Sequence, residues 1–151
     1  MKVLLLSCSP NGEIDEVTSL LTKSLCAHKE QLIYKHEAPA AIRFLGKLDQ
    51  FEDLGVNPND YDLIVIGIEK LDGYYVKSLR DILEKQNVSQ KKIAFYYLDE
   101  LRARFAHRHL LKALEGNQIM GSLAIKDVQN NYHKYVIPIV QWANNIVSKC
   151  I

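Results

Sequence analysis

The chain has little cysteine, little net charge and no long hydrophobic run, and each scarcity excludes a class of protein. Its three cysteines are odd in number and lack metal-ligand spacing, so they predict reduced thiols rather than a disulfide framework. The net charge of +1 and the lack of a recognised binding motif argue against nucleic-acid binding. No apolar run approaches the roughly 20 residues of a membrane span. Since Met1-Lys2 leads directly into an apolar segment with no signal peptide before it, we expect a cytoplasmic protein with no membrane association.

Motifs for hydrolytic chemistry are missing as well. The sequence has no G-x-S-x-G elbow, and no Ser–His–Asp set can be placed in it, so we assign no catalytic residue. What is present is ordinary for a globular protein, with 151 residues of which 48% are hydrophobic and 25% charged. This length suits one domain with a full core, which we expect to span residues 1–151.

The nearly neutral total hides an uneven distribution of charge along the chain. Residues 1–75 carry 7 Lys and Arg against 12 Asp and Glu, whereas residues 76–151 carry 12 against 6. One interpretation is a sheet whose two edges differ in sign. The other is a positive C-terminal side that meets an acidic partner or a phosphate.

The first strand and the turn after it organise the rest of the sequence. Residues 2–6 form a short apolar run, the polar turn Ser7–Gly12 follows, and a helical pattern covers residues 13–27. A strand, a tight turn and a helix begin a βαβ unit, in which ligands bind beyond the carboxyl ends of the strands. A turn of Ser, Asn and Gly at a helix N-terminus offers hydroxyl and backbone N–H groups to an anion, most often a phosphate.

The remaining hydrophobic pattern alternates between strand and helix. Further strands are predicted at residues 31–37, 61–67, 92–98 and 119–125, and further helices at residues 41–48, 76–84, 101–116 and 132–147. Gly121 interrupts the last strand and predicts an edge position, and Pro138 is expected to kink the last helix or reset its start. Five strands alternating with five helices predict an α/β fold whose parallel sheet has helices on both faces, most commonly in the order 2-1-3-4-5.

With these elements in place, the sequence resembles the flavodoxin-like flavoproteins, including the NAD(P)H-dependent FMN reductases. Three stretches carry the resemblance: residues 6–12 at the phosphate loop, residues 62–84 at the third strand with its loop and helix, and residues 92–100 at the fourth strand and the loop after it. The resemblance implies a flavodoxin-like three-layer sandwich that binds FMN and transfers electrons, or reduces a flavin or quinone with NAD(P)H.

The resemblance also implies roles for particular residues. The phosphate of FMN would be held by the hydroxyls of Ser7 and Ser9, the side chain of Asn11 and the backbone of Gly12. One side of the isoalloxazine would meet the loop 68–75, where Tyr74 or Tyr75 could stack on it. Its polar edge would lie beside residues 97–99, so the other cofactor-binding candidates are Tyr97 and Asp99.

The partners follow less directly from these residues. A redox partner protein or NAD(P)H would exchange electrons with the flavin, and the sequence does not choose between them. It also leaves open whether the chain forms a homodimer. A basic run, Arg102 to His109, places Arg104 and Arg108 on one helix face. It would meet the 2′-phosphate of NADPH or an acidic partner, or it is a solvated helix face.

Several residues of the turn and of the helix start after it disfavour a phosphate, and two other functions therefore stay open. Pro10 stands where the family commonly has Gly or a variable residue, and Glu13, Asp15 and Glu16 would repel a phosphate. At ~4 Å, a like-charge contact costs about 4 kcal/mol at an effective dielectric constant of about 20. A cofactor-free interaction module of the same fold is therefore the alternative. A divergent phosphorylation-receiver domain comes third, because Gly67 and Ser7-Cys8 stand where its acidic residues should be.

Overall fold

A computed structural model gives the fold and describes residues 1–33, 53–71, 73–99 and 103–151. The elements in chain order are β1 (Val3–Cys8), α1 (Asp15–Ser24), β2 (His28–Gln31), the short 3-10 helix η1 (Pro58–Asp60), β3 (Leu63–Ile68), α3 (Gly73–Lys85), β4 (Lys92–Leu98), α4 (Ala103–Ala113), β5 (Gln118–Ile125) and α5 (Val128–Cys150).

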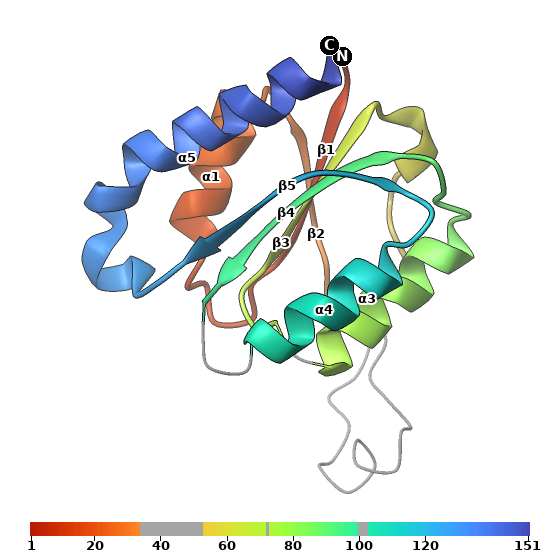
Figure 1. Cartoon of the computed structure of the whole chain (residues 1–151), viewed down its shortest axis with the longest axis horizontal. Helices are drawn as coiled ribbons and strands as arrows, with labels where there is room; N and C mark the ends of the chain where they lie inside the picture. The colour runs from red at the N-terminus through yellow and green to blue at the C-terminus, as the bar shows by residue number, and fades with distance from the viewer. Residues whose placement is uncertain (34–52, 72, 100–102) are drawn as a thin grey trace, which may run out of the picture.

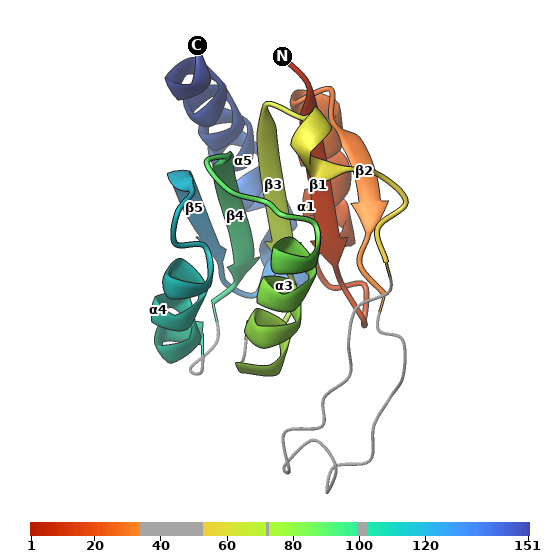
Figure 2. The same cartoon turned by 90° about the vertical axis from the view of Figure 1, so that its right-hand side faces the viewer.

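The five strands form one parallel sheet in the order β2-β1-β3-β4-β5, as the sequence predicts. Helices α1 and α5 cover one face of the sheet, and α3 and α4 cover the other (Figures 1 and 2). The strands all run in one direction, so their carboxyl ends and the loops that follow them lie at the same edge. We call this edge the carboxyl edge of the sheet.

The core consists of two halves divided by the sheet, because alternate strand residues point to opposite faces. In β1, Leu4 and Leu6 pack toward α3 and α4, whereas Val3 and Leu5 pack toward α1 and α5. All residues of β1 and of β3 are buried. This two-sided burial is why both strands read as continuous apolar runs in the sequence.

The second strand differs from its prediction. The sequence indicates residues 31–37, but β2 is His28–Gln31, and Leu32 and Ile33 follow it outside the strand. Residues 34–37 and the predicted helix at residues 41–48 lie outside the described part of the chain. Helix α1 ends at Ser24, and Cys26 then adopts a left-handed φ of 48°, which turns the chain into the sheet early. Because β2 is an edge strand of mostly exposed polar residues, it gives no hydrophobic signal.

The C-terminal third also departs from its prediction in one respect. Helix α5 begins at Val128, and its non-helical residue is Asn131, with φ −127° and ψ 16°, rather than Pro138, which lies within the helix. Strand β5 is an edge strand, as Gly121 predicts. Among the described helices, none is both long enough and apolar enough to cross a membrane.

Candidate functional site

The turn between β1 and α1 is closed by a glycine in a conformation that other residues avoid. The N–H of Gly12 donates to the carbonyl of Ser9 at 3.2 Å, and the φ of Gly12 is +74°. A Cβ at this position would also lie 3.1 Å from Oδ2 of Asp15. Glycine is therefore favoured here by the backbone conformation, whereas the exposed side chain of Asp15 could shift to make room.

Two backbone N–H groups of this turn converge on one carboxylate. The N–H of Asn11 donates to Oε2 of Glu69 at 2.8 Å, and the N–H of Glu13 donates to Oε1 of the same residue at 3.3 Å. We call these two N–H groups the cradle. Glu69 is buried, with 2% of its surface exposed. Backbone donors that converge just before a helix suit an oxyanion, and here the chain supplies that oxyanion itself.

The pairing of β1 with β3 brings Glu69 to the cradle. Cys8 and Ile68 are the last paired residues of these strands, and the N–H of Glu69 donates to the carbonyl of Cys8 at 2.9 Å. The loops after both strands therefore start side by side at the carboxyl edge. Glu69 was not predicted as a site residue. Its signal in the sequence is a carboxylate placed directly after a buried strand that neighbours β1.

More acidic groups stand close to the cradle at the start of α1. Asp15 and Glu16 occupy the first helical turn and are exposed. The residue before them, Ile14, provides no side-chain cap, and its N–H donates to Oγ of Ser9 at 3.4 Å. Acidic residues stabilise a helix N-terminus, but these also add negative potential beside any anion in the turn.

The first predicted phosphate ligand, Ser7, faces the interior instead of the turn. Its Oγ lies 3.3 Å from Oγ1 of Thr18, which lies 2.6 Å from the hydroxyl of Tyr96, and all three residues are buried. Burial raises the pKa of the Tyr96 phenol, although the hydroxyls of Thr18 and Ser7 oppose this effect. The ring of Tyr96 passes beside Gly67, where a Cβ would lie 2.2 Å from Cζ. We call Ser7, Thr18 and Tyr96 the hydroxyl network.

The predicted ring-binding residues lie elsewhere on the carboxyl edge. Tyr97 is half-buried near the end of β4, and its ring packs on His107 at a centroid distance of 5.7 Å. Burial raises the pKa of Tyr97, and the charge of Asp99 adds to this rise. Asp99 lies 3.6 Å from Nζ of Lys126. Tyr97 and Asp99 thus have protein partners already.

The tyrosines of the β3–α3 region are only partly described. Tyr75 is half-buried and packs against the core on the α3 and α4 side of the sheet. The side chain of Tyr74 lies outside the described residues. Taken together, the structure brings Ser9, Asn11 and Gly12 into one turn, where Asn11 presents its backbone N–H to the cradle. Their roles toward a cofactor stay predictions.

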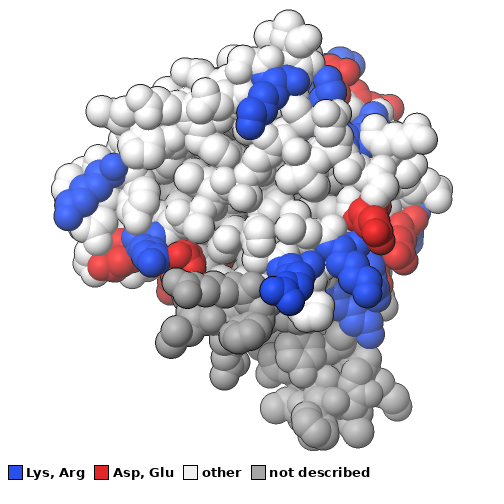
Figure 3. All heavy atoms as spheres, viewed as in Figure 1, with Lys and Arg blue, Asp and Glu red and all other residues white. Residues whose placement is uncertain are grey.

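The basic run is also described only in part. Arg108 and His109 are exposed on α4, and His107 is half-buried against Phe95 and Tyr97. Arg102 and the side chain of Arg104 lie outside the described residues. On the face shown in Figure 3, basic side chains gather over α3 and α4. The exposed residues of the run, Arg108 and His109, lie on one of these two helices.

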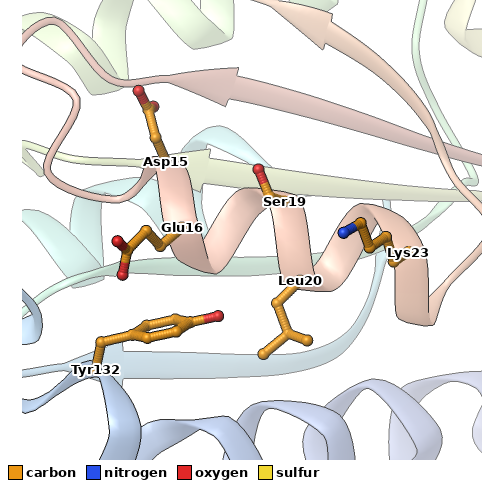
Figure 4. Close-up of a pocket in the computed structure, with 6 residues that line it drawn as sticks. All are labelled: Asp15, Glu16, Ser19, Leu20, Lys23 and Tyr132. Atoms are coloured by element: carbon orange, nitrogen blue, oxygen red, sulfur yellow. The ribbon is translucent and has the colours of Figure 1, made fainter.

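A surface hollow of about 300 Å³ lies between α1 and α5 (Figure 4). It is lined by Asp15, Glu16, Ser19, Leu20, Lys23 and Tyr132. None of the predicted cofactor-binding residues is among them. Within the described part of the chain, no group of three or more His, Cys, Asp and Glu is placed to hold a metal ion.

Comparison with known proteins gives structural matches only, since no family model and no curated protein matches the chain. The chain is similar to a flavoprotein of Lactobacillus acidophilus solved in complex with FMN, with 18% identity, a TM-score of 0.59, and 89% of this chain and 97% of that one covered. It is similar to a two-electron reduced flavodoxin of Megasphaera elsdenii, with 11% identity, a TM-score of 0.52, and coverage of 93% and 97%.

The fold is flavodoxin-like. A GTP-binding protein of Sulfolobus solfataricus in complex with GDP matches as well, with 12% identity, a TM-score of 0.55, and coverage of 96% of this chain and 53% of that one. A flavodoxin-like fold at these identities therefore does not by itself choose the ligand. The choice has to be argued from the residues at the carboxyl edge.

Proposed function

We propose that this chain binds FMN at the carboxyl edge of its sheet and works as a small redox protein. The observation that carries the proposal is the cradle, in which the N–H groups of Asn11 and Glu13 converge on one oxyanion at the end of β1. The flavodoxin-like fold supports it, because ligands of such sheets bind beyond the carboxyl ends of the strands. The similar flavoprotein solved with FMN supports it too.

The cradle fits the phosphate of FMN in its donors but not in its free space. Both N–H groups already donate to Glu69, and a phosphate placed there would meet the carboxylate at contact distance. Like charges about 4 Å apart repel by several kcal/mol near a protein surface. The phosphate and Glu69 therefore exclude each other, and FMN binding requires this carboxylate to leave the cradle.

The rest of the site would orient the isoalloxazine, while the flavin supplies the redox chemistry when bound. The half-buried rings of Tyr97 and Tyr75 offer flat apolar walls, and Asp99 places a negative charge directly after the end of β4. The electron donor would be a redox partner protein or NAD(P)H. In the second case the exposed Arg108 on α4 would meet the 2′-phosphate of NADPH.

The test is a flavin titration of the purified chain. Bound FMN should show the visible absorbance of oxidised flavin after removal of free ligand, and it should raise the free energy of unfolding by about 2.7 kcal/mol at a hundredfold excess over its dissociation constant. A colourless protein whose thermal stability does not change with added FMN would reject the proposal. Where FMN binds, reduction of the bound flavin by NADPH distinguishes NAD(P)H from a redox partner protein as the electron donor.

A cofactor-free interaction module is the second candidate function, and Glu69 favours it. A chain that fills its own anion site needs no ligand there to satisfy the backbone donors of the turn. Under this hypothesis the untreated chain is stable without flavin, and a binding partner is recovered by pull-down. Tight binding of FMN to the unmodified chain would contradict it.

A further inference from the structure

The carboxylate of Glu69 lies where an anionic ligand of the turn would bind. Both of its oxygens accept hydrogen bonds, from Asn11 and from Glu13, and its own N–H is tied to Cys8. The backbone of Cys8 therefore fixes the start of the Glu69 side chain, and the two N–H groups of the cradle fix its end. Side-chain carboxylates and phosphate monoesters use the same donors, because both present oxygen acceptors with negative charge.

Among the described residues, the partners of the Glu69 carboxylate are the two N–H groups of the cradle. Within the described residues, no Lys, Arg or His forms an ion pair with it. Burial of an unpaired carboxylate is costly unless hydrogen bonds compensate it, and here the two backbone donors are that compensation. The carboxylate and the cradle thus stabilise each other, and an incoming phosphate has to replace both contacts.

We propose that Glu69 is a built-in competitor for the phosphate group, which keeps the cradle closed to FMN until the carboxylate is displaced. The part that concerns FMN rests on the proposed function, whereas the part that concerns an oxyanion does not. The free chain should therefore discriminate poorly between FMN and riboflavin, which has the same ring system without a phosphate. Removing the carboxylate should restore a preference for the phosphate.

The experiment compares the unmodified chain with Glu69→Ala, which empties the cradle, and Glu69→Gln, which keeps the shape of the side chain without its charge. FMN and riboflavin are titrated by quenching of flavin fluorescence. We expect Glu69→Ala to bind FMN at least about tenfold more tightly than the unmodified chain, with the affinity for riboflavin unchanged. If Glu69→Ala does not fold, Glu69→Gln should show the same change in the same direction.

A second measurement needs no flavin. Melting temperatures are compared in inorganic phosphate and in chloride at matched ionic strength. Phosphate should raise the melting temperature of Glu69→Ala but not that of the unmodified chain, because only the variant has free donors in its cradle. The matched control is Glu16→Gln, which removes one exposed negative charge from the same helix start without touching the cradle. Both responses should change less in Glu16→Gln than in Glu69→Ala, because the charge of Glu16 adds to the potential at the turn but does not occupy the two donors.

The two measurements separate the two proposals. If neither flavin binds but phosphate stabilises Glu69→Ala alone, the proposed function is overturned and the role of Glu69 is upheld. If FMN binds the unmodified chain and both Glu69 variants equally, the role of Glu69 is overturned and the proposed function is upheld. If Glu16→Gln gains as much affinity for FMN as the Glu69 variants, the loss of any negative charge near the turn explains the gain, and the role of Glu69 as a competitor is overturned.

Discussion

Two polar clusters flank the end of β1, and they differ in charge and in access to solvent. The hydroxyl network of Ser7, Thr18 and Tyr96 is neutral and closed between the sheet and α1. The cradle holds a charged side chain, Glu69, at the carboxyl edge. A closed neutral network has no place for a ligand and contributes to stability. A carboxylate held by backbone donors can be exchanged for another oxyanion, so the proposed function is placed at this edge.

Gly67→Ala should have the largest effect, because it breaks the packing around the hydroxyl network. A Cβ at Gly67 would lie 2.2 Å from Cζ and 2.3 Å from the hydroxyl oxygen of Tyr96, which is fully buried. We expect the free energy of unfolding to fall by more than about 3 kcal/mol, at the upper end for overpacked cores. Urea denaturation measures the loss.

The matched control for that substitution is Gly55→Ala, since a Cβ at Gly55 would meet nothing within 4 Å. Its effect should stay within about 0.5 kcal/mol, as at other open surface positions. Equal losses in the two variants would show that Tyr96 does not limit the space beside Gly67.

Tyr96→Phe should come next, because it removes one member of the hydroxyl network and keeps the ring. The hydroxyl of Thr18 then loses a partner at 2.6 Å in a buried layer, so we expect a loss of about 1–3 kcal/mol in the free energy of unfolding. Tyr132→Phe is the control, because Tyr132 is half-buried and its hydroxyl makes no hydrogen bond with a described residue. A cost for Tyr132→Phe as large as that for Tyr96→Phe would contradict the importance of the network.

Alkaline pH should have the next largest effect, a gradual fall in the free energy of unfolding that the hydroxyl network contributes. Burial raises the pKa of Tyr96 in the folded chain, whereas the unfolded tyrosine loses its proton near its usual pKa of about 10. Above that pH the unfolded state binds fewer protons, so this contribution to stability is complete below about pH 10 and falls by up to about 1.4 kcal/mol per pH unit as the pH rises.

The measurement is the difference in the free energy of unfolding between the unmodified chain and Tyr96→Phe, taken at neutral pH and at about pH 11. The difference should shrink in alkali. A difference that is the same at both pH values would show that Tyr96 titrates alike in the folded and unfolded states.

Asp99→Asn should have the smallest effect and tests the carboxyl edge away from the cradle. It breaks a contact of 3.6 Å with Lys126, whose side chain is 66% exposed. Exposed pairs of this kind contribute less than about 1 kcal/mol and are weakened by salt. Unfolding at low and high ionic strength should therefore show a small loss that vanishes in salt. The side chain of Asp99 itself is 21% exposed, so a larger, salt-independent loss would mean that it contributes to stability through more than its contact with Lys126.

The predictability of the elements follows their burial. Strands β1, β3 and β4 were predicted within two residues of their bounds, because burial on both faces leaves nearly continuous apolar runs in the sequence. Ser7 and Cys8, which were assigned to the turn, belong to β1. Strand β2 was misplaced, since an edge strand of polar residues carries no such signal. In α5 the non-helical residue is Asn131, which lies directly before the predicted helix of residues 132–147, while Pro138 continues inside the helix.

The residues of the candidate site were likewise predicted only in part. Local sequence placed Ser9, Asn11 and Gly12 in one turn, because a strand, a tight turn and a helix are consecutive in the chain. It also assigned the Ser7 hydroxyl to that turn, whereas the pleat of β1 directs the side chain to Thr18 under α1. Alternation along a strand is visible in the sequence, but the identity of the facing residue depends on how the helix packs.

The sequence alone determined the order of the described strands and helices and the position of the turn whose backbone donors could meet an anion. These follow from periodicity and turn chemistry, which are local. Only the tertiary structure decided what those donors hold. Glu69 is 58 residues away from Asn11 along the chain, and it reaches the cradle because β1 and β3 pair in parallel and end together at one edge of the sheet.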